Sequence, residues 1–468
     1  MKSDTYTMSK KITDLGKDSI GSLLFKLATP AIIAQVVNVL YNIVDRIFIG
    51  RMENGELAMA GVGVSFPIIL LISAFSALVG YGGAPLAAIK MGENDHDGAE
   101  KIVTNAFSSL IILSLILTAT FTLFKEPILW AFGASDATIT YALEYTSIYV
   151  MGTIFVQIAL GMNPFINTQG FAKFGMITVL VGAITNIVLD PIFIFGFDMG
   201  VSGAALATVS AQAVSALWVL AFLRGKQNKL RIRREYLIPS PKIVLSIVTL
   251  GISPFIMQST ESLVLISLNS QLMLFGGDLA VGAMTIMSSV MQIVTLPLMG
   301  LTSGAQPIIS YNFGAKQFDR VRQTFRLLIS ITLPATMLMC FVLVTFPTVF
   351  VNIFNDDPAL VEVTADAMRI YFSGIFLLGA QFACQQTFLA LGQAKISLVL
   401  ALLRKILLLV PLIFILPMIL DNQLDAVFLA EPIADILASL STITAFTIFY
   451  RRVLNVKDAD ALVEKADA

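Results

Sequence analysis

Charged residues are scarce in this sequence. Asp, Glu, Lys and Arg together make up 13% of its 468 residues, whereas 57% of the residues are hydrophobic. An ordinary soluble domain carries about 25% charged residues, so the composition argues against a soluble globular protein. The formal net charge is −1, and no basic patch is interleaved with aromatic residues. Nothing in the charge pattern therefore indicates a nucleic-acid partner.

Histidine and cysteine are nearly absent as well. The only histidine, His96, lies in a short polar loop, and the two cysteines, Cys340 and Cys384, lie in apolar runs. Buried cysteines of this kind usually behave as small hydrophobic residues rather than as a disulfide or a metal site. A membrane-embedded enzyme would need a His, Cys or Ser constellation at membrane depth. We therefore predict a protein that is not an enzyme and that uses no cofactor.

Long apolar runs are what the sequence has in abundance. Runs of about 20–28 residues alternate with short polar breaks, which is the pattern of transmembrane helices. Twelve runs begin near Ser22, Leu57, Ile102, Tyr141, Phe174, Val201, Ile243, Leu279, Leu327, Thr364, Ile396 and Asp425. Residues 1–20 are polar and rich in lysine, without the pattern of a removable signal peptide. The predicted fold class is an all-α integral membrane protein with twelve transmembrane helices.

Basic residues follow every second apolar run. The N-terminal segment, the even-numbered loops and the segment after the last run carry most of the lysines and arginines, whereas the odd-numbered loops are rich in acidic residues. The positive-inside rule then puts both termini in the cytoplasm, with an even number of spans between them.

The two halves of the chain repeat each other. Pro85 and Pro307 lie 222 positions apart, as do Gly92 and Gly314. A constant offset across prolines and glycines indicates two six-helix lobes of parallel topology, a recurrent plan among secondary transporters. The predicted division is an N-terminal cytoplasmic tail, an N-lobe, a basic cytoplasmic linker, a C-lobe and a C-terminal cytoplasmic tail, covering residues 1–20, 21–224, 225–242, 243–452 and 453–468.

Two carboxylates stand out within the apolar runs of the N-lobe. Asp45 lies in the first run, and Asn186 and Asp190 lie four residues apart in the fifth, on one face of a helix. Thr208 enters the sixth run at a similar depth, about 8–10 Å below the outer surface at 1.5 Å per residue. A charged side chain at the bilayer centre costs at least about 2.5–3.5 kcal/mol, so such residues usually serve a function.

These four residues form an all-oxygen set that suits a hard cation such as sodium, or a shared proton. Pro191 adds a further oxygen, because it removes a backbone donor and frees a carbonyl. The C-terminal half keeps the helices but not the acids, since Leu412 stands 222 positions after Asp190 and Asn269 stands 224 positions after Asp45. The alternative is a purely structural role, in which Asp45 pairs with Arg46 and Asp190 caps a helix.

The run from Leu40 to Gly50, followed by Asn-x-x-x-Asp-Pro at 186–191 and by Thr208, resembles the multidrug and toxic compound extrusion (MATE) family. The resemblance covers about residues 20–452. It implies a multi-pass protein of the bacterial cell membrane that exports lipophilic, often cationic drugs in exchange for sodium or protons by rocking its two lobes. It also implies that Asp45, Asn186, Asp190 and Thr208 form the ion-coupling site, with no other metal site.

Further polar and aromatic residues are candidates for contact with substrate. Tyr41 could present an aromatic face to a cationic drug, although it could equally be an ordinary interface aromatic. The other candidates are Gln35, Asn38, Gln157, Asn163 and Glu261. For Glu261 the alternative is an ion pair with a basic residue of the C-lobe. The expected partners are small-molecule drugs and the lipid bilayer, and we expect a monomer.

Two more sets of residues have competing interpretations. Glu431 and Asp435 share a face of the last run, and with Arg404 and Lys405 they are expected to form structural ion pairs. Within transport, the rival to a drug exporter is a flippase for lipid-linked precursors. A flippase for anionic pyrophosphate lipids should line its cavity with arginines, whereas here the N-lobe runs hold carboxylates, with only Arg46 near them.

Overall fold

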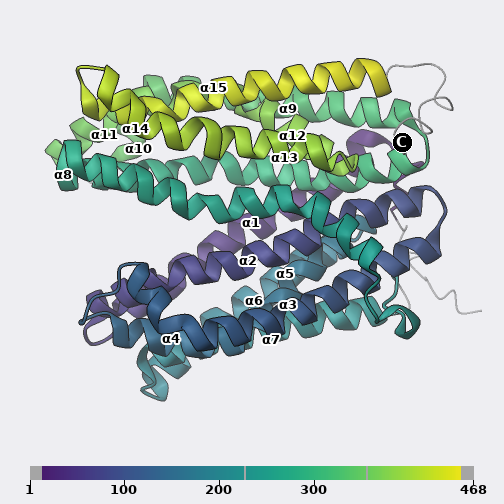
Figure 1. Ribbon diagram of the computed structural model, residues 1–468, viewed down its shortest axis with the longest axis horizontal. Coiled ribbons are helices and arrows are strands. Elements are labelled where there is room, and N and C mark those ends of the chain that lie inside the picture. The colour runs from purple at the N-terminus through teal and green to yellow at the C-terminus, as the bar shows by residue number, and fades with distance from the viewer. Residues whose placement is uncertain (1–12, 226–227, 355–356, 455–468) are drawn as a thin grey trace, which may run out of the picture.

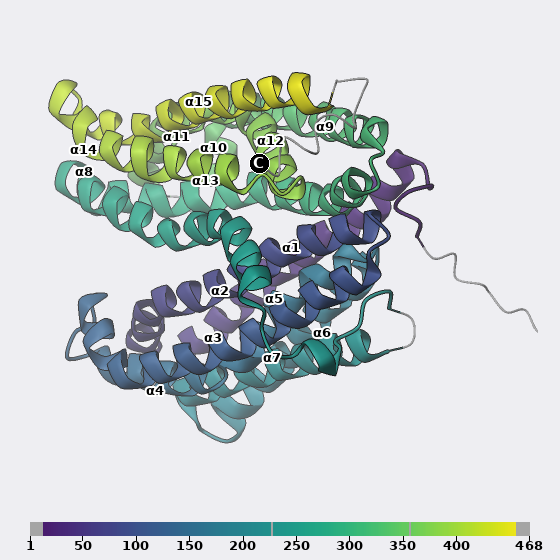
Figure 2. The ribbon, with the colours of Figure 1, turned by 45° about the vertical axis from the view of Figure 1, so that its right-hand side comes forward.

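The computed structural model describes residues 13–225, 228–354 and 357–454, and this part of the chain is almost entirely helical, without strands. Much of the predicted N-terminal tail (residues 1–12) and most of the predicted C-terminal tail (residues 455–468) lie outside the described residues. The helices form two bundles that lie side by side (Figures 1 and 2). Two lobes of this kind are what the offset of 222 positions predicts.

The first bundle contains α1 to α7. Its elements are α1 (Ile20–Gly50), α2 (Gly55–Gly92), α3 (His96–Ala131), α4 (Ile139–Met151), α5 (Thr153–Thr168), α6 (Ala172–Pro191), a π-helical turn (Ile192–Gly196) and α7 (Gly200–Arg224). Helices α4 and α5 together make one span that is bent by 59°.

The second bundle contains α8 to α15. Its elements are α8 (Pro241–Gly314), α9 (Phe318–Thr345), α10 (Pro347–Val351), α11 (Pro358–Tyr371), a 3-10 turn (Phe372–Leu377), α12 (Leu378–Ala390), α13 (Ala394–Leu402), a π-helical turn (Leu403–Leu409), α14 (Val410–Ile419), α15 (Gln423–Phe449) and a last π-helical turn (Tyr450–Leu454).

Ten helical segments of the described chain are long and apolar enough to cross a membrane, and the bent pair α4–α5 supplies an eleventh. The longest segment, α8, has 74 residues and is broken at Gly277, where φ is 63° and ψ is −158°. At about 1.5 Å per residue, α8 is more than twice as long as a bilayer core is thick, so it contains two spans. The total is therefore twelve, and the predicted fold class is confirmed.

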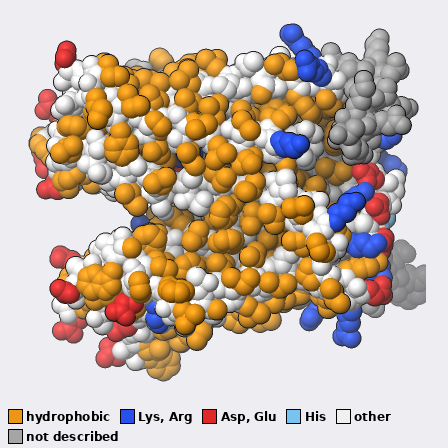
Figure 3. Space-filling model, in the orientation of Figure 1, with side chains coloured by type: hydrophobic (Ala, Val, Ile, Leu, Met, Phe, Trp, Pro, Cys, Tyr) orange, Lys and Arg blue, Asp and Glu red, His pale blue; other side chains and the backbone are white. Residues whose placement is uncertain are grey.

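The lobes touch at one end of the molecule and separate at the other. Lys and Arg gather mainly at the right-hand end of Figure 3, and the opposite end is mostly acidic. Between the lobes the acidic end is hollowed, so a cleft opens there (Figure 3). The basic end is closed by helices α2 and α8, which approach each other backbone to backbone.

One close approach between α2 and α8 is symmetric. A Cβ atom on Gly92, at the end of α2, would lie 2.0 Å from the carbonyl oxygen of Tyr311, and one on Gly314 would lie 2.0 Å from that of Ile89. These two contacts are related by the offset of 222 positions. Only glycine fits at either place without moving a backbone, so the repeat is expressed here as a two-fold contact between lobes.

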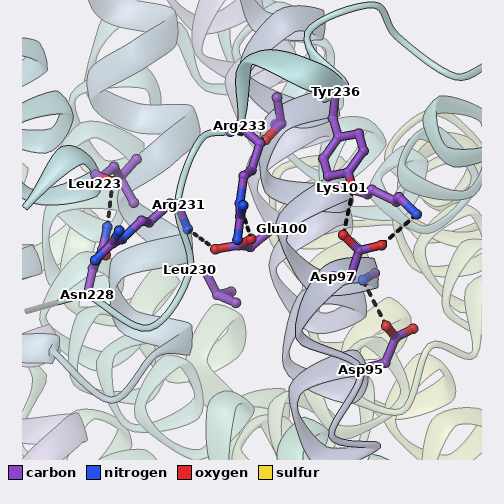
Figure 4. A network of polar contacts seen from close by, with 12 residues as sticks. Asp95, Asp97, Glu100, Lys101, Leu223, Asn228, Leu230, Arg231, Arg233 and Tyr236 are labelled. Atoms are coloured by element: carbon purple, nitrogen blue, oxygen red, sulfur yellow. Dashed lines mark hydrogen bonds and ion pairs between the residues drawn. The ribbon is translucent and has the colours of Figure 1, made fainter. Parts of the chain in front are cut away.

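The segment between the lobes is fixed to the N-lobe by polar contacts (Figure 4). The Arg233 side chain donates to the Glu100 carboxylate at 2.6 Å, and the other oxygen of Glu100 accepts from the backbone N–H of Arg231 at 3.1 Å. The Tyr236 hydroxyl donates to Asp97 at 2.6 Å, and this contact raises the pKa of Tyr236. Residues 228–240 therefore form a strap that belongs to the N-lobe. The predicted boundaries of the lobes at 224 and 243 stay a prediction.

The glycine contact can be tested by substitution. Gly92→Ala should lower the free energy of unfolding by about 1–3 kcal/mol, because the new methyl group overlaps a backbone carbonyl that cannot rotate away. Gly63→Ala, in the same helix, is the matched control, because a Cβ there meets nothing within 4 Å. Thermal unfolding of the purified proteins in detergent is the measurement. Equal stability of the two variants would contradict this account of the closed end.

Candidate functional site

Asn186 and Asp190 lie on one face of α6, as their spacing predicts. The Asn186 amide donates to Asp190 Oδ1 at 3.1 Å and to the Thr208 hydroxyl of α7 at 3.4 Å. Asp190 is fully buried and Asn186 is 1% exposed, whereas Thr208 is half-buried. One amide thus ties two membrane helices together and holds the carboxylate in place.

The backbone leaves the regular α-helix directly after Asp190. Helix α6 ends at Pro191, and the five residues that follow form a wider π-helical turn. Proline removes the N–H that would continue the regular ladder, and such turns are frequent at functional sites. The turn packs closely on α7, because a Cβ on Gly203 would lie 2.8 Å from the carbonyl oxygen of Phe193.

Asp45 of α1 joins this group from the opposite side. Its carboxyl lies close enough to that of Asp190 for the two to interact directly. Three buried oxygens here have no hydrogen-bond donor in the described chain, namely Asp45 Oδ1, Asn186 Oδ1 and Asp190 Oδ2. Acceptor oxygens that converge in a dry place without a donor suit a hard cation or a proton.

Asp45 forms no close ion pair with its neighbour Arg46. No ion pair within the described residues includes Asp45 or Asp190, and the Arg46 guanidinium lies 5.6 Å from the ring centre of Phe66. Across the described ranges, no group of three or more His, Cys, Asp or Glu residues could hold a metal ion. The oxygen set therefore relies on two carboxylates, an amide and a hydroxyl.

Tyr145 of α4 was missed in the sequence. It is 4% exposed, it lies near Thr208 and Asp45, and its ring stacks on that of Tyr149 at 6.0 Å. The signal that could have found it is the spacing of Tyr141, Tyr145 and Tyr149, which puts three aromatic residues on one face of a helix. Tyr41 lies near Asp45 and Asp190 as well.

Two stretches of the chain, residues 30–192 and 253–415, match the sequence profile of MatE. The chain belongs to the MatE family. This is the family that the sequence motifs resemble, and the two matching stretches fall in the two lobes.

Relatives of this MatE chain span nearly its whole length. The multidrug export protein MepA of Staphylococcus haemolyticus (strain JCSC1435) is 26% identical over 425 residues, which cover 90% of this chain and 93% of that protein. MepA of Staphylococcus aureus (strain N315) is 25% identical over 400 residues, covering 85% and 88%.

Solved structures share the fold at lower identity. A crystal structure of MATE in the bent conformation matches with a TM-score of 0.88 at 22% identity, covering 97% of this chain and 98% of that one. A MOP superfamily transporter from Pyrococcus furiosus, for which a reversed polarity of the binding pocket suggests a different function, matches with a TM-score of 0.86 at 23% identity, covering 96% and 99%.

The other predicted residues of this MatE chain are not gathered around Asp190. Gln157 is buried and donates to the carbonyl of Ile72 at 2.8 Å, and Asn163 donates to the carbonyl of Gly175 at 3.2 Å. Both side chains thus hold N-lobe helices together. Gln35 is half-buried and Asn38 is exposed, on the same helix as Asp45.

The C-lobe candidates form ion pairs. Lys405 donates to Glu261 at 2.8 Å, which is the alternative considered for Glu261. Arg404 lies 2.7 Å from Asp435 and 3.5 Å from Glu431, in agreement with the expectation for these residues.

The role of Tyr145 gives a prediction for the MatE site. Tyr145→Phe keeps the ring but removes a buried hydroxyl near Thr208 and Asp45, so the affinity of the proposed site for a cation should fall by up to about tenfold, the most that one hydrogen bond contributes. The measurement is the concentration of sodium, or of protons, that protects the purified protein against thermal unfolding. Tyr141→Phe, one turn away, is the control, and an equal shift in both variants would argue against the assignment.

Proposed function

We propose that this chain is a multidrug exporter that takes up a sodium ion or a proton in exchange for each drug it expels. The observation that carries the proposal is the set of three buried oxygens on Asp45, Asn186 and Asp190 that lack a donor in the described chain. The relatives named as multidrug export proteins support the transport function.

The coupling rests on the electrostatics of the two aspartates. Two carboxylates in a low-dielectric site cannot both stay ionised without a positive charge beside them. When a sodium ion or a proton arrives, the pair becomes neutral, and the arrangement of α1, α6 and α7 that is stable with the cation differs from the one that is stable without it. A ligand can shift such an equilibrium only through this difference in affinity.

The orientation follows from the distribution of charge. The basic end, where the strap lies, faces the cytoplasm, and the cleft at the acidic end faces outward. Export then requires the opposite state, in which the contacts of Gly92 with Tyr311 and of Gly314 with Ile89 separate and the acidic end closes. Both termini would lie on the cytoplasmic side of a bacterial cell membrane, in a transporter that works as a monomer.

The substrates would be lipophilic, often cationic drugs. Tyr41 lies close to the aspartates, and Gln35 and Asn38 precede it on the same helix, so these residues are proposed to meet a drug in the cleft. Glu261 has a side chain that is 50% exposed although it is paired with Lys405, so it offers negative charge from the other lobe.

A flippase for lipid-linked precursors is the second candidate, because a relative of the same fold is described as having a reversed pocket polarity. An anionic headgroup would need arginines or lysines without acidic partners. The two C-lobe cations at membrane depth, Arg404 and Lys405, are both paired with acids. This pairing favours an exporter of neutral or cationic compounds.

Removal of one charge tests the site. Asp190→Asn should reduce ethidium efflux from cells to the background level while the protein stays in the membrane, because the amide cannot carry the charge that a cation neutralises. Asp198→Asn is the matched control, since Asp198 is exposed after the same helix and has a positive φ of 54° that Asn tolerates. Normal efflux by the Asp190 variant would count against the coupling site.

The identity of the cation can be separated from its site. Purified protein in lipid vesicles is tested with a sodium gradient alone and then with a proton gradient alone, and at least one of the two should drive expulsion of a drug. Both are tested because an all-oxygen set suits either ion. The gradient that drives transport identifies the coupling ion, and the Asp190→Asn variant should respond to neither. Drug movement that ignores both gradients would rule out antiport.

A further inference from the structure

The C-lobe carries a cluster of charged side chains on the counterparts of the helices that build the N-lobe site. Glu261 comes from the first span of α8, Arg404 and Lys405 from the π-helical turn after α13, and Glu431 and Asp435 from α15. These elements correspond to α1, α6 and α7 at offsets of 222–224 positions. Tyr371 of α11, the counterpart of Tyr149, lies near the cluster too.

The charges in this cluster do not balance. Three carboxylates face two cations, and each cation already has a close partner, Arg404 with Asp435 at 2.7 Å and Lys405 with Glu261 at 2.8 Å. Glu431 has only a longer contact with Arg404, at 3.5 Å. If all five groups were ionised, one negative charge would remain, and it would fall on the Glu431–Asp435 pair.

The Glu431–Asp435 pair is also the most deeply buried part of the cluster. Glu431 is 4% exposed and Asp435 is 1% exposed, and Glu431 Oε2 and Asp435 Oδ2 have no hydrogen-bond donor in the described chain. A third such atom, Oε1 of Gln381, belongs to a residue that is 7% exposed and that lines a small cavity together with Arg404. An excess charge in such a place is removed by protonation more readily than it is tolerated.

The small cavity beside the cluster is lined by Arg404 and Gln381, not by the two acids, and its volume of about 10 Å³ is at most the space of one water molecule. Because Glu431 and Asp435 are almost fully buried, the positive species that reaches them without opening the packing is a proton. We infer that the Glu431–Asp435 pair of the C-lobe binds one proton, which neutralises the charge that Arg404 and Lys405 leave over. This site is separate from the one proposed in the N-lobe and does not depend on it.

Every titratable group around the pair enters this balance. Glu261 and Lys405 form one neutral couple, Arg404 and Asp435 form another, and the Tyr371 hydroxyl is neutral. Glu431 is left as the carboxyl that must carry the proton. A neutral amide has almost the shape of a protonated carboxyl, so Glu431→Gln reproduces the proposed native charge state.

The test is the pH dependence of unfolding of the full-length protein in detergent, compared between wild type and Glu431→Gln. A proton held by the folded state and lost on unfolding makes stability fall as pH rises, by about tenfold in the unfolding constant per pH unit above the pH at which a free carboxyl ionises. Glu431→Gln should match the wild type at acidic pH, where the carboxyl is protonated in both the folded and the unfolded state. It should become more stable than the wild type as pH rises, because it lacks this one-proton decline. A constant difference between the two proteins at all pH values would overturn the proposal.

Asp435→Asn is the contrasting variant. It breaks the 2.7 Å contact with Arg404 and leaves that cation buried with a weaker partner, so it should lower stability much more than Glu431→Gln does. A network of five ionised groups would instead make both variants costly, and equal losses would contradict the inference.

Infrared spectroscopy supplies a measurement that does not require the C-lobe variants to fold. The double variant Asp45→Asn/Asp190→Asn removes both carboxyls of the proposed N-lobe site, yet it should keep the carbonyl stretch of a protonated carboxyl above neutral pH. Persistence of this band supports the C-lobe proton independently of any transport activity. Its absence from the double variant overturns the C-lobe site without touching the proposal for the N-lobe.

Discussion

Two buried carboxylates without an internal cation are the constraint on which the N-lobe is organised. Asp190 is fully buried, Asp45 lies against it, and no ion pair within the described residues reaches either one. Such a pair is costly unless a positive charge comes from outside. The Asn186 amide links Asp190 to the Thr208 hydroxyl, but these neutral groups cannot neutralise the acids.

The C-lobe meets the same constraint in the opposite way. There the cations are part of the chain, on a π-helical turn that brings Arg404 and Lys405 toward the acids of two other helices. The N-lobe position that corresponds to Arg404 is Gly182, where even a Cβ would lie 2.3 Å from the hydroxyl oxygen of Ser215. Packing therefore keeps an internal cation out of the N-lobe, so the C-lobe acids have two internal cations beside them, whereas Asp45 and Asp190 have none.

Most of the fold could be predicted from the sequence, because the bilayer imposes a helix on every long apolar run. The offset of 222 positions gave the two lobes, and the i, i+4 spacing of Asn186 and Asp190 gave their shared face. Gln157 and Asn163 show where such reasoning fails. A buried amide can line a cavity or bind a neighbouring carbonyl, and only the packing of α2, α5 and α6 decides between these outcomes.

Tyr145 was missed for a related reason, although its spacing with Tyr141 and Tyr149 marks one face of a helix. An aromatic residue in an apolar run most often faces lipid, and the rotation of one helix against the next is not encoded in its own periodicity. The break at Gly277 and the π-helical turn after Pro191 are likewise local answers to packing, although a proline or glycine marks the place of each.

The strap of residues 228–240 has a consequence for how the lobes rotate. Contacts with Glu100, Asn105 and Gln169 fasten it to the N-lobe along its length, up to the backbone N–H of Ser240. The segment that resembles a flexible linker in the sequence is therefore held against the N-lobe. A rocking motion would have to pivot at the single junction before Pro241, which makes the connection a short hinge rather than a tether.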